Sequence, residues 1–342
     1  MHQSFFLPNE LLSLSMLSLC PVYKATPMIA IQTESFTKIL FKDETARMGL
    51  GSFKALGGVY AVARLIQDKW QRENHQELDH KNMLEPFVRE FAKRMTFVCA
   101  SAGNHGLAVA VGASVFGANA KIHLAKNVPE EFAVRLRQKG ADIFRSGDVY
   151  EDSMVAAITD AENSDAILLA DGSWPGYIHP PSLVMEGYTV LAEEMRRKFE
   201  HSGKWPTHVF LQAGVGGMAG AIAHMIRRNW QGGPKIVVVE PEAAACLSAS
   251  HAAGKCVTVD GHVSNMGRLD CKEPSLIAFV ALEQAGVSYI TVSDAQAEAA
   301  TVQLSELGLY TTPSGAAGYA AVQRYDLPKN ATPLVIITEG SL

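Results

Sequence analysis

The stretch HVFLQAGVGGMAGAIAHMI, residues 208–226, decides the fold class of this chain. It begins with a short apolar run, which is typical of a strand in a sheet that is covered on both faces. Glycines follow the run directly, and an apolar helical pattern starts among them. A strand, a glycine turn and a helix in this order indicate an open α/β architecture with parallel strands.

The same order of strand and helix recurs on both sides of this stretch. Apolar runs of strand character are TKILFK (37–42), TFVCA (96–100), AKIHL (120–124), ADIF (141–144), AILL (166–169), KIVVV (235–239) and LVIIT (334–338). Helical patterns separate these runs. A length of 342 residues suits about two domains of roughly 150 residues each.

The composition predicts a well-buried globular enzyme. Apolar residues make up 48 % of the chain and charged residues 19 %, which excludes a disordered, collagen-like or disulfide-scaffold protein. The net charge is −5, and the longest run of basic residues is the triplet 196–198. Nucleic acid is therefore not an expected partner, because a duplex-binding surface needs a concentrated positive field.

The cysteines and the first residues indicate the compartment. The five cysteines, which are widely spaced and form no C-x-x-C pair, predict thiols in a reducing compartment. No H-E-x-x-H motif is present, and no metal site is expected. Residues 11–20, LLSLSMLSLC, follow Glu10 instead of a basic flank and are too few to cross a bilayer. We expect an amphipathic helix packed on the core there, and a cytoplasmic protein without a membrane partner.

Two glycine-containing turns follow expected strands and open expected helices, where free N–H groups and a partial positive charge suit an anion. GVGGMA, residues 214–219, does not match the triphosphate motif G-x-x-x-x-G-K-[ST] but fits a phosphate monoester. SAGNHG, residues 101–106, offers hydroxyl, amide and backbone donors for a carboxylate and a phenolic oxygen. Each could instead serve structure alone, the first as a packing turn and the second as a helix cap.

A third turn, GSFK at residues 51–54, places Lys54 in the first turn of an expected helix. A cation is electrostatically misplaced at that end of a helix. Nearby positive potential and partial burial would lower the pKa of the Lys54 amine and make it nucleophilic. An exposed surface lysine is the alternative. With the phosphate turn and the carboxylate loop, a lysine between Phe53 and Ala55 completes the parts needed to hold pyridoxal phosphate.

The ordered motifs GSFKALGG, SAGNHG, AGVGGMAG and PSGAAG resemble the fold type II pyridoxal-phosphate lyases, the superfamily of threonine dehydratase and the tryptophan synthase β-subunit. With YKATPM, DGSWPGY, VVVEPE and ITEG, the chain looks most like the diaminopropionate ammonia-lyases, from about Pro21 to its last residues. The resemblance implies two open parallel-sheet α/β domains with the cofactor in the cleft between them. Residues 1–90 and 191–342 would form the large cofactor-binding domain, and residues 91–190 the small domain that carries the substrate loop.

The resemblance also implies roles for single residues. Lys54 would carry pyridoxal phosphate as a Schiff base and remove the Cα proton, and Asp171 would be the acid that assists the leaving group, although an ordinary loop aspartate remains an alternative for Asp171. The cofactor would further contact Phe53, Asn104, Gly214, Val215, Gly216, Gly217, Met218 and Thr338. The substrate would contact Ser101, Ala102, Gly103, Asn104 and His105.

Two of these positions carry a chemical consequence in the resemblance. Asn104 would bind the phenolic oxygen of the cofactor, and Thr338 would face its pyridine nitrogen. A neutral hydroxyl at Thr338 does not keep that nitrogen protonated as an aspartate would, which favours rapid loss of a β-substituent over transamination.

The activity implied by the resemblance is the α,β-elimination of 2,3-diaminopropionate to pyruvate and ammonia, by a homodimer. An L-threonine or L-serine dehydratase, or another β-eliminating or β-replacing enzyme, is the alternative; a catalytically silent amino-acid binder is a third reading. Relatives that use both enantiomers carry an aspartate where this chain has Ala102, and that aspartate is their base for the D-substrate. We therefore expect little activity on D-amino acids.

Overall fold

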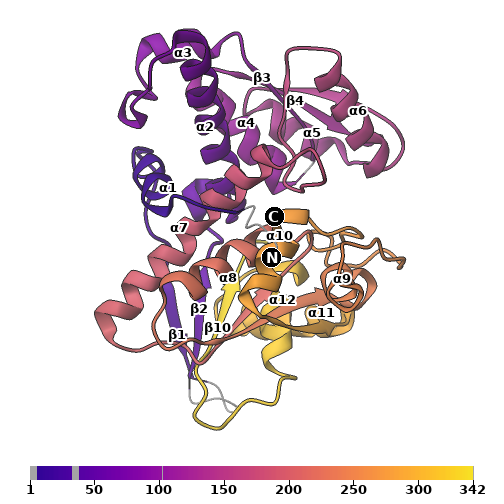
Figure 1. Ribbon diagram of the computed structural model, residues 1–342. Helices are drawn as coiled ribbons and strands as arrows, with labels where there is room; N and C mark the ends of the chain where they lie inside the picture. The colour runs from indigo at the N-terminus through magenta and orange to yellow at the C-terminus, as the bar shows by residue number, and fades with distance from the viewer. Residues whose placement is uncertain (1–5, 33–37, 102, 342) are drawn as a thin grey trace.

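The computed structural model describes residues 6–32, 38–101 and 103–341, and it contains two β-sheets in the two halves of the molecule (Figure 1). The larger sheet has the strand order β1 (Met28–Ile31), β2 (Ile39–Asp43), β10 (Pro333–Ile337), β7 (His208–Gln212), β8 (Lys235–Pro241) and β9 (Ser288–Val292). The smaller sheet has the order β5 (Ala141–Arg145), β4 (Asn119–Leu124), β3 (Thr96–Ala100) and β6 (Ile167–Leu168).

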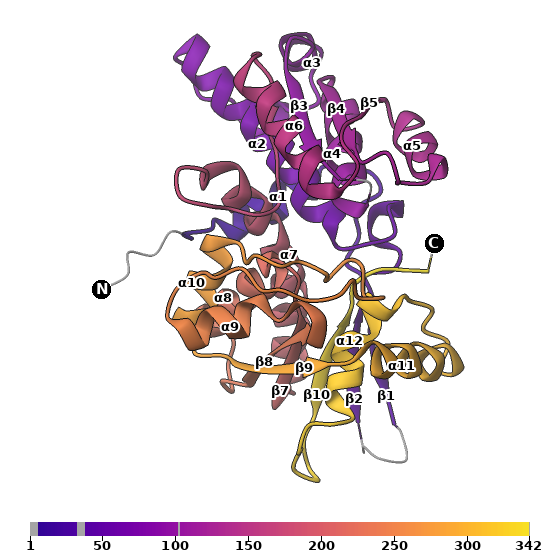
Figure 2. The same cartoon turned by 90° about the vertical axis from the view of Figure 1, so that its right-hand side faces the viewer.

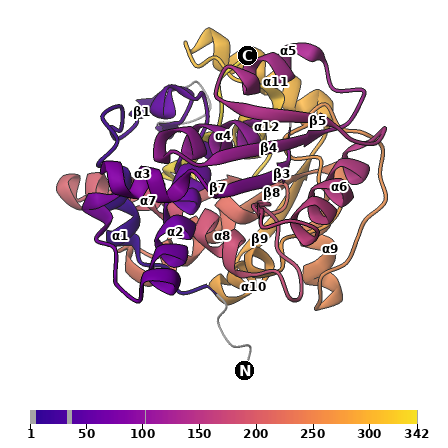
Figure 3. The ribbon, with the colours of Figure 1, turned by 90° about the horizontal axis from the view of Figure 1, so that it is seen from above.

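Twelve α-helices lie among the described residues. They are α1 (Glu10–Leu17), α2 (Lys54–Asn74), α3 (Pro86–Ala92), α4 (Asn104–Phe116), α5 (Glu130–Arg137), α6 (Tyr150–Glu162), α7 (His179–Ser202), α8 (Gly217–Asn229), α9 (Cys246–Ala253), α10 (Leu276–Ala285), α11 (Asp294–Glu306) and α12 (Pro313–Val322). Helices cover both faces of the larger sheet (Figure 2). In the smaller sheet, α4 and α6 contact β3 and β4 (Figure 3).

The predicted α/β class and each predicted strand are confirmed, but the sheets are not wholly parallel. β1 pairs with β2 in antiparallel fashion at one edge of the larger sheet, and every other pairing between named strands is parallel. β1 and β9 were not predicted. Both lie at edges and are only partly buried; β9 mixes polar and apolar residues, and β1, although apolar, has only four residues.

Side chains that alternate between two buried faces explain why the central strands are apolar at successive positions. In β7, Val209 and Leu211 face the core that also holds the buried side chains of α7, α8 and α10. Phe210, between them, faces the opposite core, beneath α11 and α12. Because helices cover both faces, a polar residue in the middle of β7 would be buried without water.

The helix predicted over residues 11–20 is α1. It packs on α7, where the hydroxyl oxygens of Ser13 and Thr189 lie 3.1 Å apart. Leu11 is exposed, so the apolar residues of α1 are not gathered on one buried face, and the predicted amphipathic pattern is wrong. No helix among the described residues has the length and apolarity needed to cross a membrane.

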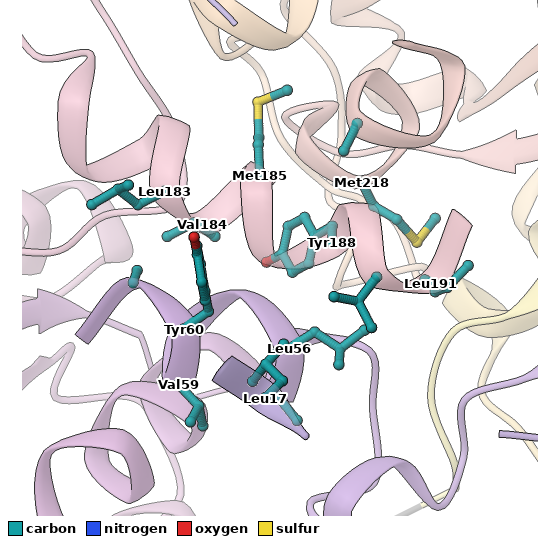
Figure 4. Close-up of a cluster of buried hydrophobic side chains, with 14 of the residues drawn as sticks. Leu17, Leu56, Val59, Tyr60, Leu183, Val184, Met185, Tyr188, Leu191 and Met218 are labelled. Carbon is teal, nitrogen blue, oxygen red and sulfur yellow. The ribbon is translucent and has the colours of Figure 1, made fainter. Parts of the chain in front are cut away.

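Helices α2 and α7 cross at two glycines. A Cβ at Gly57 would lie 2.4 Å from Cε1 of Tyr188, and one at Gly187 would lie 2.6 Å from the carbonyl oxygen of Leu56. Figure 4 shows Leu56 and Tyr60 from α2 in the same apolar cluster as Tyr188 from α7 and Met218 from α8. A larger residue at either glycine would separate the two helices, and would therefore separate Lys54 at the start of α2 from Tyr188 on α7.

A cluster of charges is buried just before α2. Arg47, fully buried, binds Glu44 (Nε–Oε2, 2.7 Å) and Glu194 on α7 (Nη1–Oε1, 2.7 Å). Lys42 at the end of β2 also binds Glu194 (Nζ–Oε2, 2.6 Å), and the Tyr23 hydroxyl donates to the same carboxylate (2.8 Å). Two cations and two carboxylates balance one another there, so each is paired despite its burial.

We expect Glu194→Ala to lower the free energy of unfolding by about 3–5 kcal/mol, because it leaves the charges of Lys42 and Arg47 buried without their shared partner. The matched control is Glu200→Ala, on the same helix, which breaks only a surface pair with Arg196 and should lower stability by less than about 1 kcal/mol. Urea denaturation followed by circular dichroism measures both variants. Equal losses would contradict the role given to the buried cluster.

Candidate active site

The predicted motifs follow the carboxyl ends of strands in both sheets. Ser101 follows β3, Asp171 follows β6, Gly214 follows β7 and Thr338 follows β10. Open α/β sheets bind ligands at these strand ends, because the turns there are free to carry polar groups. Lys54 joins them from the start of α2, after the turn that follows β2.

Backbone hydrogen bonds fix the turn before Lys54 against the end of β10. The Phe53 N–H donates to the carbonyl oxygen of Thr338 (3.1 Å), and the Gly340 N–H donates to that of Gly51 (3.0 Å). Gly51 has φ +82°, a conformation that L side chains rarely adopt. This turn sets Lys54 as the first residue of α2, as predicted, and the Lys54 N–H donates to the Ser52 hydroxyl (3.3 Å).

Lys54 forms an ion pair with Asp171, its Nζ donating to Oδ2. The two side chains are only 21 % and 23 % exposed. Burial by itself would lower the pKa of the Lys54 amine, but the Asp171 carboxylate outweighs burial and raises it above its ordinary value. Burial would likewise raise the pKa of Asp171, and the Lys54 charge holds it well below its usual range. The predicted lowering of the Lys54 pKa is therefore wrong, because the sequence did not show that a carboxylate faces the amine.

Two aromatic rings border the Lys54 amine. Its Nζ lies 5.4 Å from the ring centre of Phe53 and 5.8 Å from that of Tyr188, and the two rings meet edge to face at 5.0 Å. Burial raises the pKa of Tyr188 to about 12, so the phenol stays neutral at physiological pH. Tyr188 was not predicted as a site residue, since it lies in the middle of a long helix and carries no local motif.

The glycine turn after β7 leads into α8. Gly216 has φ +97° and precedes the first residue of α8, and no side chain caps this helix. A Cβ at Gly214 would lie 2.9 Å from Sγ of Cys271, which leaves no room for a side chain. One at Gly217 would lie 3.7 Å from the Tyr188 ring and 3.9 Å from the Asp171 carbonyl oxygen, so the turn lies beside the residues around Lys54.

Val215 and Met218 are the other two predicted residues of this turn. The Val215 carbonyl oxygen accepts a hydrogen bond from the Ser275 N–H (2.9 Å), and the Met218 side chain is buried. The Ser275 hydroxyl in turn lies 2.7 Å from that of Ser173, two residues after Asp171. Ser275 thus ties the glycine turn to the loop that carries Asp171.

The SAGNHG loop leads into α4. The Gly103 N–H donates to the Ser101 hydroxyl (3.3 Å), and Asn104 Nδ2 donates to Glu339. Ala102, predicted to touch the substrate, lies outside the described residues. His105 is buried, its Nε2 lies 2.7 Å from the carbonyl oxygen of Leu169, and burial lowers its pKa. Since the imidazole is then neutral, Nε2 carries the proton that is donated to this carbonyl.

Thr338 is buried at the carboxyl end of β10. Its hydroxyl oxygen lies 3.4 Å from Nε2 of Gln212, which also donates to the carbonyl oxygens of Ile336 (2.8 Å) and Gly315 (3.1 Å). Gln212 therefore joins the ends of β7 and β10. Its role depends on which strands are neighbours, and the sequence motifs did not reveal it.

An open cavity of about 580 Å³ lies beside Asn104, the first residue of α4. Gly51, Asn104 and Glu339 line it on one side, and Phe132 and Arg135 of α5 line it on the other. The cavity therefore gives a small solute access to the substrate loop. Within the described ranges, no group of three or more His, Cys, Asp or Glu side chains could hold a metal ion.

A model of the family described as pyridoxal-phosphate dependent enzyme matches residues 19–339, and the chain belongs to this family. Among its curated relatives is the diaminopropionate ammonia-lyase of Escherichia coli strain K12, which is 31 % identical over 345 residues, covering 93 % of this chain and 85 % of the relative.

Solved structures of the Escherichia coli diaminopropionate ammonia-lyase share the fold. Its complex with D-serine has a TM-score of 0.84 at 29 % identity and covers 99 % of this chain and 90 % of that chain. Its complex with an aminoacrylate-PLP azomethine reaction intermediate has a TM-score of 0.82 at 29 % identity and covers 98 % of this chain and 92 % of that one. The α/β fold predicted from the sequence, a fold type II pyridoxal-phosphate enzyme, is thereby confirmed.

The residues present fit pyridoxal phosphate. Gly216 and Gly217 place no side chain at the uncapped start of α8, where N–H groups suit a phosphate. A partly buried primary amine, Lys54, lies beside this turn, with Phe53 and Tyr188 as aromatic neighbours for a ring. A neutral hydroxyl, Thr338, lies at the end of an adjacent strand.

We expect Asp171→Asn to lower the pKa of the Lys54 amine by about 1–3 units, because the variant removes the charge that stabilises the ammonium while burial remains. Only the neutral amine attacks an aldehyde, so the pH at which apoprotein binds pyridoxal phosphate covalently at half the maximal rate should fall by a similar amount. Visible absorbance against pH, with borohydride trapping at residue 54, measures this. Asp142→Asn, on an exposed position of β5, is the control and should leave that pH unchanged. An unchanged pH for Asp171→Asn would contradict the pairing.

Proposed function

We propose that the protein is a pyridoxal-phosphate dependent ammonia-lyase that converts L-2,3-diaminopropionate to pyruvate and two molecules of ammonia. The observation that carries this proposal is the Lys54–Asp171 pair beside the glycine turn. Similarity to diaminopropionate ammonia-lyases over 93 % of the chain supports the choice of substrate.

When bound, pyridoxal phosphate supplies an electron sink that makes the Cα proton of an attached amino acid acidic. We propose that Lys54 carries it covalently and that the N–H groups of residues 214–218 bind its phosphate. Asn104 would donate to its phenolic oxygen after giving up Glu339, and Thr338 would face its ring nitrogen. Phe53 would pack beside it.

Lys54 and Asp171 divide the proton transfers in this proposal. The ion pair holds the free Lys54 amine as an ammonium, and only the neutral amine can act as the Cα base. Asp171 is a poor acceptor for that proton, because the Lys54 charge holds the pKa of its carboxyl well below the usual range. When Nζ bears no charge, burial by itself raises the pKa of Asp171, so that the carboxyl can hold a proton and donate it to the β-amine as it leaves.

The substrate would lie against the loop of residues 101–105. Ser101 offers a hydroxyl, Gly103 an N–H and Asn104 an amide at the start of α4, where a carboxylate is favoured by the helix dipole. His105 would hold the loop against the Leu169 carbonyl, close to the Asp171 loop. Ala102 brings no carboxylate to this loop.

We further propose the division into a large domain of residues 1–90 and 191–342 and a small domain of residues 91–190, with the cofactor between them. We also propose that the protein is a homodimer and that it lies in the cytoplasm. The cysteines support the cytoplasmic location, because thiols stay unpaired in a reducing compartment and all five are free in the structure: Cys20, Cys99, Cys246, Cys256 and Cys271.

A panel of L-2,3-diaminopropionate, L-serine, L-threonine and O-acetyl-L-serine tests the leaving group. We expect the highest kcat/KM for L-2,3-diaminopropionate, measured as pyruvate and ammonia formed, and a loss of at least about 1000-fold in Lys54→Ala. Faster turnover of L-serine or L-threonine would establish the dehydratase instead. Cofactor uptake without any product would leave only a binding protein.

The enantiomer preference has its own test. We expect weak or absent turnover of D-2,3-diaminopropionate, because Ala102 provides no base on that face of the substrate. Ala102→Asp should raise the activity on the D-enantiomer by at least about tenfold and leave that on the L-enantiomer within a few-fold. Ala102→Asn is the matched control, with similar size and no carboxylate. Equal turnover of both enantiomers by the unaltered protein would contradict this assignment.

A further inference from the structure

Arg268 reaches the substrate loop from a part of the chain that contributes no recognised motif. Its backbone lies on the glycine turn, since a Cβ at Gly214 would be 3.2 Å from the Arg268 carbonyl oxygen. Its N–H donates to the hydroxyl of Ser314 (3.1 Å), the second residue of α12. From this anchored backbone the side chain extends to Gly103, where a Cβ would lie only 2.9 Å from Nη1. Gly103 is thus a glycine that makes room for a guanidinium.

The guanidinium is held on one edge only. Its Nε lies 3.6 Å from Oε2 of Glu339, which is an ion pair but too long for a good hydrogen bond. Glu339 is already engaged, because its Oε1 accepts from the Thr312 hydroxyl (2.6 Å) and its Oε2 accepts from Asn104. Among the described residues, no acceptor takes a hydrogen bond from the two Nη groups of Arg268. The side chain is 36 % exposed, so a solute can reach it.

The Arg268 guanidinium lies where the start of α4 already favours an anion. Gly103 is the N-cap of α4, and the N–H groups that open this helix carry a partial positive charge. A guanidinium beside them adds a second positive charge. Glu339 offsets part of this charge from the Nε side, but its oxygens already accept from Thr312 and Asn104. The Nη groups of Arg268 and the N–H groups that open α4 therefore remain as donors for a further anion.

We propose that Arg268 binds the α-carboxylate of the amino-acid substrate with its Nη groups, beside Gly103 and Asn104. A planar guanidinium matches a carboxylate with two parallel hydrogen bonds, and Glu339 keeps its plane in place from the Nε edge. The proposal rests on the proposed function, in that the ligand is an amino acid. It makes Arg268 a specificity-determining residue that selects free amino acids over their amides and over simple amines.

Equilibrium binding to the holoenzyme tests this without turnover. L-Alanine has no β-substituent to lose, and L-alaninamide replaces its carboxylate with a neutral amide of similar size. By isothermal titration calorimetry, Arg268→Gln should weaken L-alanine binding by about 10- to 100-fold, as expected for the loss of a charged hydrogen-bonded pair, and change L-alaninamide binding by less than about threefold. Arg268→Lys keeps the charge but lacks the two parallel N–H donors of a guanidinium, so its affinity for L-alanine should lie between those of Arg268→Gln and the unaltered protein.

The control is Arg135→Gln, which removes a positive charge on α5 from the wall of the cavity that Asn104 and Glu339 also line. It should not change the preference for L-alanine over L-alaninamide. The proposal is overturned if Arg268→Gln weakens both ligands equally, as a structural role would, or if Arg135→Gln matches it. It is also overturned if Arg268→Gln weakens only L-aspartate, since the guanidinium would then serve a side-chain carboxylate. Failure of the diaminopropionate assay leaves these binding ratios intact, so the two proposals can fail separately.

Discussion

The arrangement of the site depends on a buried charge cluster, in which Glu194 of α7 holds Lys42 and Arg47 from the segment that leads into α2. Charges this deeply buried are tolerated only in one geometry, because any displacement leaves a cation or a carboxylate without its partner. The cluster therefore fixes the chain between β2 and α2 relative to α7. Lys54 begins α2 seven residues later, so its position is set before any ligand is bound.

The close crossing of α2 and α7 continues the same constraint into the site. Gly57 and Gly187 let the backbones approach, and the Tyr188 ring then lies beside the Lys54 amine. The glycine turn of α8 rests against the other side of that ring. An amine, a phosphate-binding turn and an aromatic side chain are thus brought together by helix packing, whereas the polar groups of Asp171 and Thr338 come from strand ends.

Much of this fold and site could be predicted from local patterns. Covered strands need apolar side chains on both faces, so β7 and β10 were evident, while the partly buried edge strands were missed, because β1 is short and β9 mixes polar and apolar residues. Glycine turns between a strand and a helix have few uses, which singled out residues 214–217. The pKa of Lys54 was predicted in the wrong direction, because its partner is 117 residues away along the chain.

By itself, the sequence determined the α/β class, the order of strands and helices along the chain, and the turns able to bind anions, since each depends on residues close together in the chain. Only the tertiary structure decided which charges meet. Asp171 faces Lys54, Glu339 holds Asn104, and Arg268 lies against Gly103, although none of these pairs shares a motif. Such contacts depend on which strand ends are neighbours in space, because the energy of two charges depends on the distance between them in space and not on their separation in the sequence.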